Sequence, residues 1–237
     1  MTFARVQDMA QEAARRGDLA PHQLAALARL DEIIATRLSN GERREVTNLW
    51  RAKGSPAASP PAGNSSALLT VPYFAQNDNA SGQGARECAS SSAAMVAAFW
   101  GKIASDDAYN TIRARFGDTT NLDAQVAALR SLGLDARFRT DGTPALLEQE
   151  IRSGRPVMVG WLHKGPASRP TGGGHYSVVI GYDATHWVHH DPNGEADMVN
   201  GGYVNHSSGR QIHYSRRNWD RRWRPDGSGW MVLVRPI

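Results

Sequence analysis

Residues 71–100 read VPYFAQNDNASGQGARECASSSAAMVAAFW and contain the only cysteine of the chain, Cys88. An extended apolar start leads into a turn-rich polar loop and then into small and apolar residues. Because this last run is apolar on most sides, it predicts a buried helix that begins at Cys88. A thiol at a helix N-terminus is stabilised as the nucleophilic thiolate. The alternative is that Cys88 is only a small buried residue.

A second segment, GGGHYSVVIGYDATHWVHHDPNG at residues 172–194, predicts two strands joined by a turn. The strands are expected at 176–182 and 186–190. In an antiparallel hairpin the start of one strand lies beside the end of the next, so His175 and Asp191 can meet. A helix-terminal cysteine followed by a histidine and a carboxylate on paired strands is the arrangement of a thiol-protease triad.

Five stretches carry a family resemblance: VPYFAQNDN, ECASSSAAM, GHYSVVIGYD, HHDPNGE and the closing GWMVLVRP. Together they resemble the peptidase C39-like branch of the papain-like cysteine peptidases, over about residues 68–237. The resemblance implies an α+β papain-like fold, catalytic Cys88, His175 and Asp191, and Gln76 as an oxyanion-hole residue. One departure is Ala89, where the transporter-linked branch that cuts leader peptides usually has glycine. This weakens a leader-processing role.

Two of these assignments have rivals in the sequence. Gln83 lies nearer to Cys88 than Gln76 does and is the alternative oxyanion donor. Asn193 is the alternative to Asp191 for orienting the histidine, although its neighbours Pro192 and Gly194 favour a turn. His189 shares a strand face with Asp191 and is a candidate to line the substrate groove.

The remainder of this region predicts helices first and a mostly antiparallel sheet second, which is an α+β plan. Apolar spacing indicates helices at 105–116 and 121–132, and Thr143-Pro144 begins another that Gly154 and Pro156 end. Strands are expected at 134–139, 157–162 and 230–234. The polar, arginine-rich stretch 200–229 is expected to form long loops that wall a substrate groove.

The N-terminal part differs in composition. Residues 1–52 predict three amphipathic helices, at 3–17, 21–38 and 42–51. Their apolar faces must pack on each other, on the second domain or on another protein. Residues 53–66, KGSPAASPPAGNSS, predict a linker. We therefore expect a helical docking or assembly unit at 1–52, a linker at 53–66 and a peptidase domain at 67–237.

Composition restricts the cofactors and partners. The chain has 237 residues, a formal net charge of +4 and a pI near 9.5, and its single cysteine excludes an intrachain disulfide and a multi-cysteine zinc site. Six of the eight histidines lie between 175 and 213, but none forms an HExxH motif on a predicted helix, so we expect no cofactor and no catalytic metal. We also expect neither nucleic-acid binding nor a membrane span.

These observations favour a cysteine peptidase that acts through Cys88, His175 and Asp191. Residues 1–18 lack the basic and apolar regions of a secretory signal, so we expect synthesis in the cytoplasm and delivery by another route, such as a virion or phage tail. The substrate would be a peptide, such as the peptide part of peptidoglycan. The alternatives are a structural or binding component on a degenerate papain-like scaffold, assembled through the N-terminal helices, and acyl transfer to an amine.

Overall fold

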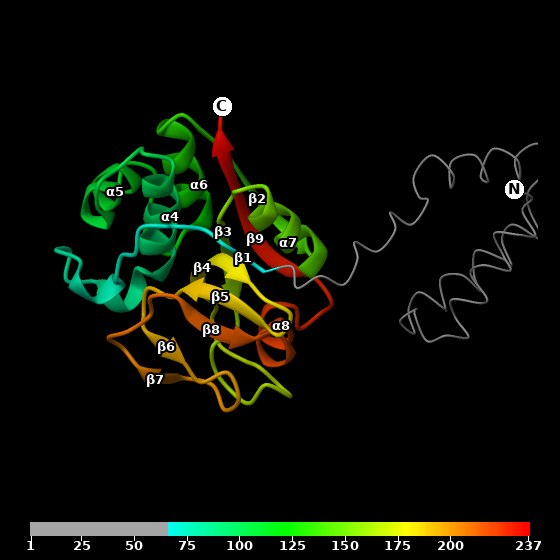
Figure 1. Cartoon of the computed structure of the whole chain (residues 1–237). Coiled ribbons are helices and arrows are strands. Elements are labelled where there is room, and N and C mark those ends of the chain that lie inside the picture. The colour runs from blue at the N-terminus through cyan, green and yellow to red at the C-terminus, as the bar shows by residue number, and fades with distance from the viewer. Residues whose placement is uncertain (1–65) are drawn as a thin grey trace, which may run out of the picture. The chain divides into compact units, whose positions relative to one another are not determined.

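The structure, a computed structural model, describes residues 66–237 (Figure 1). The three helices predicted within residues 1–52, and all but the last residue of the predicted linker, lie outside the described residues. The boundary between the two units of the chain falls after Gly63, within the predicted linker. No helix in the described part is both long and apolar enough to cross a membrane.

An antiparallel sheet of seven strands forms the centre of the described region. In spatial order its strands are β2 (Leu134–Gly142), β9 (Gly229–Pro236), β3 (Val157–Trp161), β4 (His175–Tyr182), β5 (His186–His190) and β8 (Ile212–Ser215), with β1 (Ala67–Leu68) beside β4. A separate pair joins β6 (Glu195–Ala196) to β7 (Tyr203–Asn205). The chain passes through three helices before most of this sheet, so the predicted α+β plan is confirmed.

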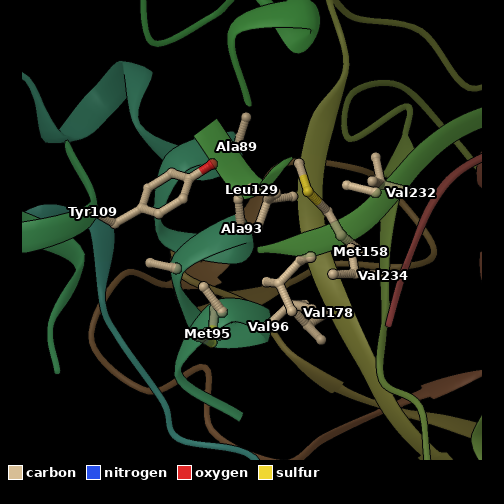
Figure 2. Close-up of a cluster of buried hydrophobic side chains, with 14 of the residues drawn as sticks. Ala89, Ala93, Met95, Val96, Tyr109, Leu129, Met158, Val178, Val232 and Val234 are labelled. Carbon is tan, nitrogen blue, oxygen red and sulfur yellow. The ribbon is translucent and has the colours of Figure 1, made fainter. Parts of the chain in front are cut away.

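Three helices cover one face of the sheet: α4 (Cys88–Phe99), α5 (Asp106–Arg113) and α6 (Leu122–Ser131). The predicted start of the central helix at Cys88 is confirmed. Ala93, Ala94 and Ala97 on α4 are fully buried, and their small side chains allow the helix to pack closely. Figure 2 shows the resulting core, in which α4 meets strand residues such as Val178 and Val232.

The ends of these helices follow from their capping residues. The side chain of Ser105 accepts a hydrogen bond from a backbone N–H of α5, and that of Asn121 does the same for α6. By contrast, Glu87 makes no side-chain capping bond to α4. The first backbone N–H groups of α4 therefore remain available at the position of Cys88.

The opposite face of the sheet is covered by α7 (Pro144–Arg152) and α8 (Arg216–Trp223). The expectation that residues 200–229 form only loops was wrong, because this stretch contains β7, β8 and α8. The signal was weak, because α8 is rich in arginine and only Trp219 and Trp223, four positions apart, give its buried face apolar side chains. Both tryptophans join the second core.

Candidate active site

Cys88 begins α4 and is partly exposed. The residue before it, Glu87, is 1% exposed and accepts hydrogen bonds from Asn79 (2.7 Å) and Ser81 (2.8 Å). These bonds hold the preceding polar loop against the helix start. The sequence thus places a single thiol at a helix N-terminus that its own loop leaves uncapped.

The β4–β5 hairpin brings His175 and Asp191 together. Its register pairs Val178 with His190, so the start of β4 lies beside the residue that follows β5. Nε2 of His175 lies 2.8 Å from Oδ1 of Asp191, and both side chains are buried. Since the carboxylate accepts, Nε2 carries a proton, and Nδ1 is the ring nitrogen left to interact with the thiol.

The pKa values of Cys88 and His175 depend on each other. Burial raises the pKa of the Cys88 thiol, but a hydrogen bond from His175 and the charge of that ring outweigh burial and set the pKa below its ordinary value. Burial lowers the pKa of His175, whereas the charge of Asp191 and hydrogen bonds to Asp191 and Cys88 raise it well above its ordinary value. These opposite shifts favour a thiolate–imidazolium pair.

Several groups fix Asp191 in place. Its Oδ1 also accepts from the backbone N–H of Asn193 (3.0 Å), and its Oδ2 accepts from the hydroxyl of Tyr214 (3.0 Å). Gly209 passes so close that a side chain there would place its Cβ 1.8 Å from the carbonyl oxygen of Asp191. Only glycine fits at position 209 without displacing the backbone of Asp191.

Gln76 lies at the start of the short 3-10 helix η1 (Gln76–Asp78), which contacts α4. Its Nε2 donates to the carbonyl of Gly84 at 2.7 Å, and its backbone N–H donates to the carbonyl of Pro192 at 2.9 Å. The side chain is 2% exposed. One amide hydrogen of Nε2 is therefore used within the loop, and the second is available to another acceptor.

The two rival residues lie elsewhere. Gln83 is exposed, and its side-chain oxygen accepts from Arg86 at 3.3 Å. Asn193 occupies the turn after Asp191, where its Oδ1 accepts from Asn77 at 3.2 Å. The group bonded to His175 is therefore the carboxylate of Asp191 and not the amide of Asn193.

Aromatic side chains surround the imidazole of His175. Trp161 contacts it edge-on with a ring-centroid distance of 5.1 Å, and the rings of Tyr203 and His163 lie 5.6 and 5.9 Å away. Burial, followed by the charge of His175, lowers the pKa of His163 to about 4, so this second ring is neutral near pH 7. These aromatic rings keep water away from the imidazole. The lower local dielectric strengthens the interactions of His175 with Asp191 and Cys88.

His189 does not line a groove, contrary to the sequence-based interpretation, because its side chain is completely buried. Trp161 donates to the hydroxyl of Ser177 (3.0 Å), which lies 3.0 Å from Nδ1 of His189. The indole can only donate, so the hydroxyl of Ser177 accepts from Trp161 and links it to the ring of His189. His189 is a neutral structural residue whose pKa burial holds well below its ordinary value.

Sequence reasoning missed Trp161, His163, Tyr203 and Tyr214 as parts of the site. None belongs to a motif, and each reaches the triad only through strand pairing or loop closure. The alternation of Ile212 and Tyr214 on β8 was the one available signal, and it is too short to distinguish a strand from a loop.

Comparison with known families adds an independent finding. The sequence pattern described as Peptidase_C39 like family matches residues 68–222, about two thirds of the chain. The chain belongs to this family. A comparison with curated proteins finds no match.

Solved structures that are similar to this C39-like chain have low sequence identity to it. A putative C39-like peptidase from Bacillus anthracis is 16% identical with a TM-score of 0.52, over 72% of this chain and 98% of that one. The peptidase domain of Streptococcus ComA, a bifunctional ABC transporter, is 19% identical (TM-score 0.43), over 65% and 93%. A double glycine motif protease from an AMS/PCAT transporter is 18% identical (TM-score 0.47), over 72% and 95%. The Bacillus anthracis structure and the family match confirm the predicted papain-like fold.

Proposed function

We propose that this C39-like chain is a cysteine peptidase that hydrolyses peptide bonds through Cys88, His175 and Asp191. The observation that carries the proposal is the hydrogen bond between His175 and Asp191, beside a thiol at the uncapped start of α4 whose pKa His175 lowers. A degenerate scaffold would have no need to retain a buried carboxylate bonded to that histidine.

In the first half of the reaction the Cys88 thiolate attacks the carbonyl carbon of the scissile bond. His175 transfers its proton to the leaving amine as the C–N bond breaks, which leaves a thioester on Cys88. In the second half His175 accepts a proton from water, and the resulting hydroxide attacks the thioester. The acid leaves and the thiol is regenerated. Asp191 keeps the ring orientation and tautomer throughout.

Negative charge on the tetrahedral oxygen needs donors that are already in place. The backbone N–H of Cys88 has no acceptor within α4, and the second amide hydrogen of Gln76 is the side-chain candidate. Loss of one such donor costs about 2.7–4 kcal/mol in other enzymes, or about 100- to 1,000-fold in kcat. We therefore assign Gln76 and the N–H of Cys88 to the oxyanion hole.

For the substrate, we propose the peptide stems of peptidoglycan, reached by delivery in a virion or phage tail to which residues 1–52 dock. The net charge of +4 supports this choice, because a positive protein is attracted to an anionic wall polymer. The same triad transfers the acyl group to an amine when an amine reaches the thioester before water does.

The test is incubation of the full-length protein with purified sacculi and with a peptide library, followed by mass spectrometry of new termini. We expect cleavage that requires Cys88, with incorporation of ¹⁸O from labelled water. The matched control is Cys88→Ala, which removes only the thiol group. Equal cleavage by Cys88→Ala contradicts the proposal. Products joined to an added amine, without ¹⁸O, indicate acyl transfer instead.

A further inference from the structure

Two histidines and one aspartate meet at the end of the sheet opposite the triad. Asp183 follows β4 directly, His186 is the first residue of β5, and His213 lies on β8. These strands lie side by side in Figure 1. Asp183 follows His175 by eight residues of extended strand, which corresponds to roughly 25 Å. The group is therefore separate from the candidate active site.

Strand register brings the two imidazoles to the same face. His213 pairs with Val188, and paired residues of antiparallel strands point to the same side of a sheet. His186 precedes Val188 by two positions and so shares that side. The two rings consequently lie next to each other, with a centroid distance of 5.9 Å.

Asp183 supplies a carboxylate whose two oxygens have different surroundings. Its Oδ1 accepts hydrogen bonds from the backbone N–H groups of Thr185 and His186, both at 2.7 Å, which fixes the turn between β4 and β5. Its Oδ2 is 3.8 Å from Nδ1 of His213. Oδ1 is thus engaged by the turn, whereas Oδ2 faces an imidazole nitrogen.

We propose that Asp183, His186 and His213 form a binding site for a divalent transition-metal ion of the zinc class. One ligating atom from each residue lies within 4.8 Å of the other two. Tetrahedral zinc with bonds of about 2.0–2.1 Å holds its ligands roughly 3.3 Å apart, so small side-chain rotations complete the site. Two imidazoles and one carboxylate suit zinc, nickel or copper rather than calcium or magnesium.

The position of the site indicates what the metal does. It ties the β4–β5 turn to β8, and β8 carries Tyr214, whose hydroxyl holds Asp191. The three side chains are 39–57% exposed, so metal enters from solvent and water fills the open coordination position. The ion stabilises the sheet edge and takes no part in the peptidase chemistry, so this inference stands apart from the proposed function.

The test uses the full-length protein in a Cys88→Ala background, because the thiol and His175 can themselves bind zinc. After treatment with a chelator, zinc is titrated in competition with a chromophoric chelator, and cobalt is added to record the visible spectrum. We expect one site, a tetrahedral cobalt spectrum, and a higher melting temperature with zinc.

Two variants with matched controls locate the site. His213→Ala removes a direct ligand and should weaken zinc binding by more than about tenfold. Even the loss of a residue that only hydrogen-bonds to a metal ligand weakens metal binding by about tenfold or more. Asp183→Asn should weaken it similarly, since asparagine keeps the turn hydrogen bonds but loses the charge. His206→Ala removes an exposed histidine outside the group and should leave zinc affinity unchanged.

Melting temperatures of the metal-free variants show whether each one is folded. Zinc affinity that is equal in the background protein and in the His213→Ala and Asp183→Asn variants overturns the proposal. So does the absence of a site that competes with the chelator. In either case the three residues form only a turn with two neighbouring imidazoles.

Discussion

At the scale of single residues, the chemistry depends on charges that share one small, partly buried space. His175 lies between the thiol of Cys88 and the carboxylate of Asp191, and each neighbour favours its protonated form. The raised pKa of His175 and the lowered pKa of Cys88 define a pH range in which both groups are charged. The range begins as Cys88 ionises, below the ordinary thiol value, and ends as His175 loses its proton, well above the ordinary imidazole value.

Asp191→Asn tests this coupling. Asparagine keeps the shape and an acceptor for Nε2 of His175 but removes the charge, so the imidazolium and the thiolate are both less stabilised. We expect the pKa for alkylation of Cys88 to rise toward its ordinary value and kcat/KM to fall. The control is Asp141→Asn, which changes an exposed aspartate paired with Arg139 and should leave both quantities unchanged. An unaltered alkylation profile in Asp191→Asn would refute the coupling.

At the scale of elements, the site is assembled by one helix start and three adjacent strands. α4 supplies the nucleophile, the β4–β5 hairpin supplies the base and its carboxylate, and β8 supplies the hydroxyl of Tyr214. The 3-10 helix η1 adds Gln76, whose backbone N–H donates to the carbonyl of Pro192. The segment before the helix and the segment after the hairpin therefore hold each other in place.

Tyr214→Phe removes the hydroxyl that donates to Asp191 and that accepts from the backbone N–H of Ala196 at 2.9 Å. A hydrogen bond to a charged group contributes about 1.5–3 kcal/mol, so kcat/KM should fall between about 10-fold and 100-fold. The measurement is kcat/KM on a cleaved peptide. Tyr182→Phe removes a hydroxyl that accepts from Arg152 instead. Equal activities of the two variants would show that Tyr214 has no positioning role.

The sequence was sufficient for the parts of the site that depend on local pattern. The run after Cys88 is small and apolar on most sides, which predicts a buried helix that begins there, and the hairpin pattern around Asp183 predicts the meeting of His175 and Asp191. The surroundings of the triad were not predictable, because Trp161 and Tyr214 reach it through the pairing of strands that are distant in sequence. The burial of His189 depends on the packing of α8, which has almost no apolar signal of its own.

At the scale of the whole molecule, two apolar cores on opposite faces of one sheet hold the site rigid. The first core lies under α4 and includes Leu129 of α6, which is completely buried (Figure 2). Movement of α4 on the sheet would move Cys88 away from His175, because Cys88 belongs to the helix and His175 to strand β4. Stability of this core and alignment of the triad are therefore linked.

Leu129→Ala creates a cavity in this core and should lower the free energy of unfolding by about 2–5 kcal/mol. Denaturant unfolding measures the change. Val204→Ala is the control, because Val204 is 65% exposed and its loss should change stability by less than about 0.5 kcal/mol. A loss below 1 kcal/mol in Leu129→Ala would contradict the packing described for α6.

The central claim is that Cys88 is an activated thiolate paired with His175, and the pH dependence of its alkylation in the folded protein tests this most directly. Since the chain has one cysteine, the measured rate reports on this site alone. We expect Cys88 to be alkylated at pH values well below the ordinary thiol pKa of about 8.5. In His175→Ala this reactivity at low pH should be lost. Reactivity that appears only near that pKa, with the same profile in His175→Ala, would contradict the account.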